Sequence, residues 1–253
     1  MNAILDGRTH LDLILVIFAI LVMPTFSAVS GARLARTPPE QRNLIARYWQ
    51  TIARGWIVAA LIMVFWRITS RPFADLGLDW PIGIMGWLGF GLDAIAVVVL
   101  AVQLERLPRQ LANRLDVAHK ALARIKITPR TGKELALFIL VAITAGVWEE
   151  LLYRGFLIWY LVPFTGTIGA IAVSSIMFGL GHSYQGWRGV VVTTAVGFAL
   201  AILYMTTHSL WWLMLAHALI DIYGGIASYR IGQLLRRSDG DKAPTAAQSA
   251  STT

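Results

Sequence analysis

Residues 135–162 of the chain read LALFILVAITAGVWEELLYRGFLIWYLV, an apolar run in which the only charged side chains are Glu149, Glu150 and Arg154. About 20 predominantly apolar residues in a helix are enough to cross the hydrocarbon core of a bilayer. In lipid such a run must be helical, because every backbone polar group has to find its partner within the segment. The stretch therefore predicts a membrane-spanning helix that carries ionisable groups in its interior.

The composition of the whole chain agrees with this interpretation. Of its 253 residues, 57% are hydrophobic and only 14% are charged, whereas about a quarter of an average soluble domain is charged. Disordered chains and disulfide frameworks have other compositions, and this chain has no cysteine. We expect no nucleic-acid partner despite the net charge of +8, because the placement of basic residues around apolar spans matters more than their sum.

Further apolar runs predict an all-α, polytopic transmembrane bundle of about seven membrane helices, or eight if the basic segment described below adds one. The predicted runs are 11–29, 52–69, 82–104, 135–162, 166–183, 190–206 and 210–228. Acidic residues interrupt the stretch before the first run, so we expect it to be retained rather than cleaved as a signal peptide. Lys and Arg concentrate in alternate connections and in the tail, which predicts a cell-membrane protein with an outside N-terminus and a cytoplasmic C-terminus.

The basic segment 105–133 carries an apolar stripe at helical spacing, formed by Leu107, Leu111, Leu115, Ala118 and Leu122. One interpretation is an amphipathic helix on an anionic membrane surface, which would make membrane lipid a partner. The alternative is an ordinary connecting helix.

Ionisable side chains inside membrane spans are rare and usually functional. Glu150 and Arg154 are four residues apart, so they can pair on one helix face. Glu149 then lies on an adjacent face without an obvious local partner, and a carboxylate in that position suits a general base. The alternative is a structural salt bridge in a transporter or receptor.

Two later runs contain histidines. His182 ends the stretch Phe178-Gly179-Leu180-Gly181-His182, and His217 precedes Asp221 by four residues, so that both lie on one helix face. Each motif alone is as compatible with structure as with catalysis. Together, two carboxylates, an arginine and two histidines in three apolar helices match hydrolysis by an activated water. No Gly-x-Ser-x-Gly, Ser-x-x-Lys or His-Glu-x-x-His motif occurs.

The chain at this point resembles the CPBP intramembrane proteases, which include the type II CAAX prenyl endopeptidases and the Abi-like proteins. The family pattern is Glu-Glu-x-x-x-Arg, then Phe-x-x-x-His, then His-x-x-x-Asn or Asp. This sequence supplies these motifs, in order and with the same spacing, as Glu149, Glu150 and Arg154, then Phe178 and His182, then His217 and Asp221. The resemblance covers about residues 134–228.

The resemblance implies a role for each matched residue. Glu149 would activate the water, and Glu150 with Arg154 would hold the site or share the chemistry. His182 and His217 would position the water or a divalent metal such as zinc, since the family has been described both as metalloproteases and as glutamate proteases. The substrate would be a membrane-bound protein or peptide.

Asp221 departs from the CAAX endopeptidases, where this position looks like an Asn that could donate a hydrogen bond to an oxyanion. An ionised Asp can only accept. Asp221 must therefore be protonated, orient His217 or bind a metal, and we favour orientation of His217.

We expect the chain to divide into three parts, of which the resemblance covers the second. Residues 1–133 would hold the N-terminal membrane helices and the basic segment, 134–228 the CPBP-like catalytic core, and 229–253 a disordered cytoplasmic tail. The expected function is intramembrane endopeptidase. The alternatives are a proton-coupled transporter, which would use the same buried groups as a relay, and a non-catalytic membrane partner of the immunity type.

Overall fold

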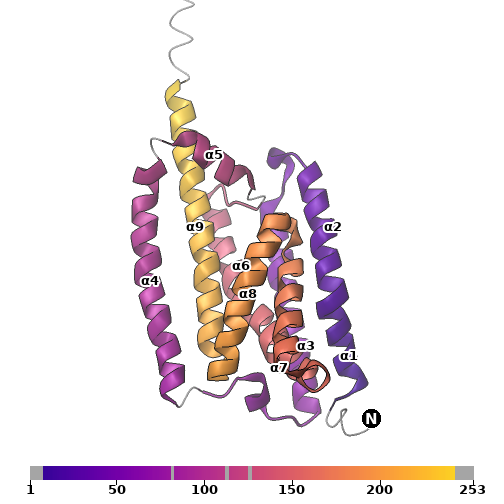
Figure 1. Ribbon diagram of the computed structural model, residues 1–253. Helices are drawn as coiled ribbons and strands as arrows, with labels where there is room; N and C mark the ends of the chain where they lie inside the picture. The colour runs from indigo at the N-terminus through magenta and orange to yellow at the C-terminus, as the bar shows by residue number, and fades with distance from the viewer. Residues whose placement is uncertain (1–7, 81–82, 112–113, 125–126, 243–253) are drawn as a thin grey trace, which may run out of the picture.

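The computed structural model describes residues 8–80, 83–111, 114–124 and 127–242. These residues form helices joined by short connections, with no strand among them, so the predicted all-α class is confirmed (Figure 1). The principal helices are α1 (His10–Ile17), α2 (Met23–Arg36), α3 (Leu44–Ile68), α4 (Ile84–Leu111), α5 (Leu115–Arg124), α6 (Gly132–Glu150), α7 (Ile158–Gly181), α8 (Trp187–Thr207) and α9 (Trp211–Lys242). Two π-helices, η2 (Phe18–Val22) and η5 (Leu151–Leu157), and three 3₁₀ turns, η3 (Pro39–Gln41), η4 (Phe73–Leu76) and η6 (Ser183–Gln185), connect them.

Five helical stretches of the described chain are long and apolar enough to cross a membrane. They are His10–Arg36, Leu44–Ile68, Trp87–Leu111, Gly132–Gly181 and Trp187–Thr207. The predicted seventh run lies in α9, which is not among the five. The chain is a multi-pass membrane protein, and the count of seven or eight spans stays a prediction.

The stretch Gly132–Gly181 takes in two of the predicted runs and is bent at Gly166. There the backbone has φ 68° and ψ 171°, outside the helical range, a conformation that glycine adopts without the steric cost of a Cβ. The second arm returns along the first, since the Ser174 hydroxyl donates to the carbonyl oxygen of Tyr153 at 2.7 Å. The bend therefore brings the end of α7 back to the level of the end of α6.

Helix α9 runs beside α6 and α4 for most of its length (Figure 1). A Cβ added at Gly146 of α6 would lie 2.5 Å from the carbonyl oxygen of Met214, so the two helices approach more closely there than a larger residue would allow. This approach places the final turn of α6 against His217.

The predicted disordered tail does not begin at residue 229, because α9 continues as a helix to Lys242. Its extension is packed: Ile231 and Leu235 are buried, and Arg230 donates to the carbonyl oxygen of Leu104 at 2.6 Å. Residues 243–253 lie outside the described residues. The structure therefore shortens the predicted tail.

The basic segment forms a helix at α5, but its apolar stripe faces the protein. Ala118 is fully buried against α9, and the leucines of the stripe pack around the same small cluster. This contact favours the connecting-helix alternative over a helix whose apolar face lies in the membrane surface.

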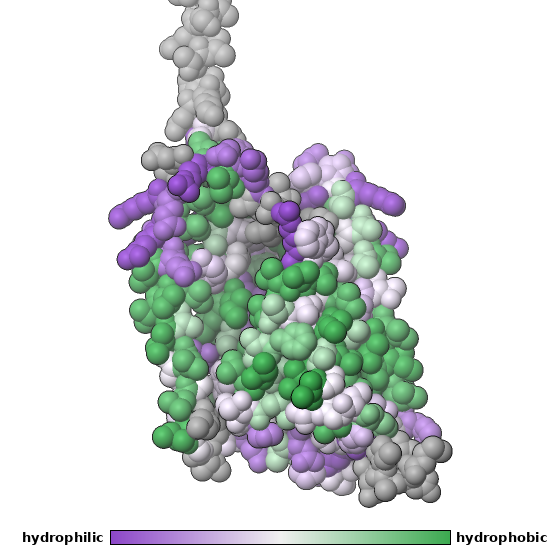
Figure 2. Space-filling model, viewed as in Figure 1, coloured by the Kyte–Doolittle hydropathy of each residue, from purple (hydrophilic) through white to green (hydrophobic). Residues whose placement is uncertain are grey.

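The surface of the molecule is banded. Figure 2 shows hydrophobic residues around the middle of the bundle and hydrophilic residues at its two ends. Many large apolar side chains are exposed, among them Ile84 at 74% and Ile168 at 85%. Water-soluble monomers rarely expose contiguous apolar surface on this scale. The band therefore fits a protein surrounded by lipid.

Candidate active site

The three motifs meet in one cluster inside the bundle. Helix α6 ends on Glu149 and Glu150, and Arg154 follows in the π-helix η5. His182 follows the last residue of α7, and His217 with Asp221 lies on α9. The π-helix changes which residues before and after it share a helix face, and such irregular turns are frequent at functional sites.

Glu150 is the anchor of the cluster and is fully buried. Its Oε1 accepts a hydrogen bond from Arg154 Nη1 at 2.8 Å, which confirms the predicted pair. The same oxygen lies 2.7 Å from His217 Nδ1. Arg154 also donates to the carbonyl oxygen of Gly197 at 3.3 Å and lies 4.2 Å over the Phe178 ring. One carboxylate thus ties α6, η5 and α9 together.

These contacts fix the tautomer of His217. The Glu150 carboxylate, ionised in its pair with Arg154, can only accept hydrogen bonds. His217 Nδ1 is therefore the donor in its contact with this carboxylate. In neutral His217 the Nε2 atom then carries a lone pair. This nitrogen lies 3.9 Å from Glu149 Oε2 and 3.7 Å from Asp221 Oδ2. Glu150, and not Asp221 as we favoured from the sequence, makes the orienting contact.

His182 is fixed in the same way. Its Nδ1 lies 2.9 Å from the carbonyl oxygen of Phe178, which can only accept, so Nδ1 is the donor and neutral His182 has a lone pair on Nε2. That Nε2 lies 3.8 Å from Glu149 Oε2. The Phe178 ring packs against both histidines, with its centroid 4.7 Å from that of His182 and 5.7 Å from that of His217.

Glu149 stands at the centre of this arrangement. Its Oε2 is buried and has no hydrogen-bond partner in the part of the chain that the structure describes. A buried acceptor without a partner costs about 1–3 kcal/mol. An atom that keeps this cost while facing two imidazole nitrogens is a candidate for contact with a reactant.

Comparison with known proteins gives one family match, over the segment that contains this cluster. Residues 131–223 match the family model of the Rce1-like type II CAAX prenyl endopeptidases. This segment is Rce1-like. It contains all seven motif residues, so the resemblance predicted from the sequence is confirmed over this part of the chain. Searches of curated proteins and of solved structures gave no match.

The metal expected as an alternative does not fit the Rce1-like cluster as it is arranged. Zinc ligands at about 2.0–2.1 Å in tetrahedral geometry stand roughly 3.3 Å apart, and Glu149 Oε2 is 3.8 and 3.9 Å from the two nitrogens. No group of three or more His, Cys, Asp or Glu side chains that could hold a metal ion occurs among the described residues. The mechanism below therefore uses no metal.

Sequence reasoning missed Tyr153, which lies in η5 beside the Rce1-like motif. Its side chain is 2% exposed, and its hydroxyl has no hydrogen-bond partner within the described ranges. The signal was present, since Tyr153 follows Glu149 by four residues inside an apolar run. A tyrosine in an apolar helix is also a common packing residue, so the pattern alone did not distinguish packing from a contact of the hydroxyl at the site.

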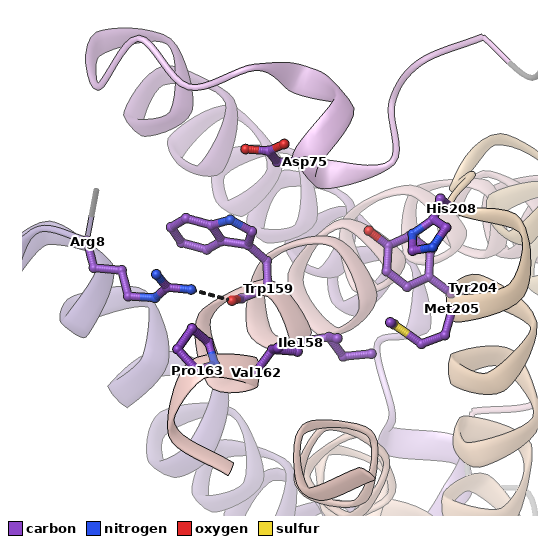
Figure 3. A pocket seen from close by; sticks show the side chains of 9 residues that line it. All are labelled: Arg8, Asp75, Ile158, Trp159, Val162, Pro163, Tyr204, Met205 and His208. Carbon is purple, nitrogen blue, oxygen red and sulfur yellow. Dashed lines mark hydrogen bonds between the residues drawn. The ribbon is translucent and has the colours of Figure 1, made fainter. Parts of the chain in front are cut away.

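An open cavity of about 240 Å³ lies elsewhere, where the first arm of α7 meets the connection between α8 and α9 (Figure 3). Arg8 reaches across its edge to donate to the carbonyl oxygen of Trp159 at 2.7 Å, and His208 lines the opposite side. No motif residue lines it, so it is separate from the Glu149 cluster.

Proposed function

We propose that the chain is an intramembrane endopeptidase, and that Glu149 activates the water that hydrolyses a peptide bond of a membrane-associated or transmembrane protein. The observation that carries the proposal is the buried, unpartnered Oε2 of Glu149, which faces the Nε2 atoms of His182 and His217. Each histidine is held by a hydrogen bond on its other nitrogen. The Rce1-like match supports the peptidase class.

The spacing suits a single water. One water can donate a hydrogen bond of about 2.8 Å to Glu149 Oε2 and a second to one of the two Nε2 atoms, because each nitrogen lies only 3.8–3.9 Å from that oxygen. Glu149 takes a proton from this water while its oxygen attacks the carbonyl carbon of the substrate. The π electrons of the carbonyl move onto its oxygen and form an oxyanion. When the oxyanion collapses, the C–N bond breaks and Glu149 returns the proton to the leaving nitrogen.

The remaining motif residues hold these groups in place. Glu150 and Arg154 fix the ring of His217 through one shared carboxylate oxygen. The Phe178 ring contacts the rings of both histidines, and the Phe178 carbonyl oxygen accepts a hydrogen bond from His182 Nδ1. Asp221 lies beside His217 Nε2 and is 39% exposed in its side chain, so we assign it to the edge of the site where the water arrives.

The orientation of the chain is part of the proposal. The ends of α2 and α9 and the whole of α5 lie at one end of the bundle (Figure 1), and Arg33 and Arg36 occupy the last turn of α2. The positive-inside rule assigns this end to the cytoplasm and the N-terminus to the outside.

The test compares newly formed peptide termini in membranes from cells that contain either the wild-type protein or Glu149→Gln. The substitution is nearly isosteric, so both proteins should be present at equal levels in folded form. We expect termini that occur only with the wild type, and these also identify the substrate. Equal sets of termini in both membranes would argue against a peptidase, and would leave transport or a non-catalytic partnership as the function.

A further inference from the structure

The Glu149 cluster contains many acceptors and few donors. The tautomers fixed by Phe178 and Glu150 leave a lone pair on the Nε2 atoms of neutral His182 and His217. The three acidic side chains, Glu149, Glu150 and Asp221, only accept when ionised. The oxyanion that forms during peptide hydrolysis needs hydrogen-bond donors aimed at it. Arg154 keeps an unpartnered donor at Nε, but its guanidinium is already held by Glu150 and by the carbonyl oxygen of Gly197. A donor outside the three motifs that is bound to no other group would complete the proposed site.

Tyr153 has the properties of such a donor. Its ring is held edge-on against Phe178, with centroids 5.5 Å apart and an interplanar angle of 83°. Its backbone carbonyl is fixed by the Ser174 hydroxyl at 2.7 Å. Because ring and backbone are both constrained, the hydroxyl is held at one position rather than swinging between several.

That position borders the cluster. A Cβ added at Gly181 would lie 3.2 Å from the Tyr153 hydroxyl oxygen, so the hydroxyl sits against the backbone immediately before His182. The charges of Glu149 and Arg154 both act on it. No hydrogen bond joins the hydroxyl to Glu149 or to any other group of the described chain, which leaves its proton for a third group.

Arg154 Nε and the indole nitrogen of Trp148 are also unpartnered donors next to the carboxylates, but the Arg154 guanidinium is bound to Glu150 and Trp148 points elsewhere. The indole nitrogen would lie 2.9 Å from a Cβ at Gly55 on α3. It therefore faces the packing interface between α3 and α6.

We propose that Tyr153 is a catalytic residue whose hydroxyl donates a hydrogen bond to the carbonyl oxygen of the scissile bond as that oxygen becomes an oxyanion. The inference rests on the proposed peptidase function. Tyr153 keeps its proton throughout, so it stabilises charge and transfers none. The hydrogen bond from Tyr153 is strongest when the negative charge on the carbonyl oxygen has developed. Its loss should therefore lower kcat with little change in KM.

The test uses an internally quenched peptide that spans the strongest Glu149-dependent cleavage found by the comparison of termini, with purified full-length protein in lipid vesicles. Removing one oxyanion donor typically lowers kcat about 100- to 1,000-fold, and we expect this for Tyr153→Phe with KM within about threefold of wild type. The matched control is Tyr204→Phe, because Tyr204 is equally buried and lines the separate cavity. Its kcat should be unchanged.

A second variant tests the position of the hydroxyl. Gly181→Ala keeps the hydroxyl but crowds it at 3.2 Å, so it should lower kcat about tenfold when Tyr153 is present and have no effect in the Y153F background. Equal effects of Gly181→Ala in both backgrounds, or wild-type kcat in Tyr153→Phe while Glu149→Gln is inactive, would overturn the role of Tyr153 and leave the peptidase proposal standing. The absence of any Glu149-dependent cleavage would overturn both.

Discussion

At the scale of single residues, the cluster depends on one shared oxygen. Glu150 Oε1 accepts from both Arg154 and His217, and all three side chains are buried. Taking such charges out of water is costly, and the cost is met only while every partner is present. The sequence predicted the pair within one helix, because Glu150 and Arg154 are four residues apart. It could not predict the contact with His217, which depends on how α9 packs against α6.

Arg154→Ala tests how far the stability of the protein depends on this buried pair. The substitution leaves the fully buried Glu150 carboxylate without its guanidinium partner, and breaking a buried pair in this way costs about 3–5 kcal/mol. Reversible unfolding in detergent should show a loss of this size. Lys120→Ala is the control, because its ion pair with Asp116 is 3.9 Å long and mostly exposed, so a change below about 1 kcal/mol is expected. Equal losses would mean that the buried pair is not specially stabilising.

The distances from Glu149 Oε2 to the Nε2 atoms of His182 and His217 give a second prediction at this scale. Because the two nitrogens are 3.8 and 3.9 Å from Oε2, wider than a zinc site, we expect dialysis against a chelator to leave the rate of peptide cleavage within about twofold of the untreated rate. Loss of cleavage that returns on adding zinc would show that the cluster rearranges around a metal.

At the scale of elements, the bend at Gly166 and the close approach of α6 to α9 assemble the site. The bend returns His182 to the level of Glu149, and Gly146 lets the backbone of α9 come near. The apolar runs 135–162 and 166–183 located both helical arms and the break between them, and the bend lies at Gly166. They gave neither the backbone conformation of the bend nor the contact partners of the two arms. The long α9 was also underestimated, since its last turns look polar in sequence and are stabilised by packing against α5 and α4.

Gly146→Ala tests the approach of α6 to α9. The added Cβ would come within 2.5 Å of a backbone oxygen that cannot turn away, so the helices must separate. We expect a loss of about 1–3 kcal/mol in unfolding free energy, and a larger fall in cleavage rate because Glu150 moves away from His217. Gly91→Ala on α4, where an added Cβ meets nothing within 4 Å, should be neutral in both measurements. A wild-type rate in Gly146→Ala would show that the approach is not needed for the site.

At the scale of the whole molecule, the banded surface agrees with a bundle surrounded by lipid, and the basic end predicts which side faces the cytoplasm. The composition predicted a membrane protein, and the exposed apolar band agrees with that prediction (Figure 2). The orientation was predicted from the distribution of Lys and Arg, because their placement around short loops decides it.

Single cysteines test the orientation without background labelling, since the chain has none of its own. Asp116→Cys on α5 should react with a membrane-impermeant maleimide only from the cytoplasmic side, and Ala74→Cys in η4 only from the outside. Both positions are exposed. Labelling of the two from the same side would contradict the proposed arrangement.

The most direct measurement of the central claim is the rate of peptide cleavage by purified protein in vesicles, compared between the wild type, Glu149→Gln and Glu105→Gln. Glu105 is a matched acidic control, because its side chain is 78% exposed on α4. We predict cleavage by the wild type and by Glu105→Gln, and a loss of at least about 1,000-fold in Glu149→Gln, since the loss of the general base removes the activation of water. Cleavage by Glu149→Gln at the wild-type rate would contradict the role of Glu149 as the base.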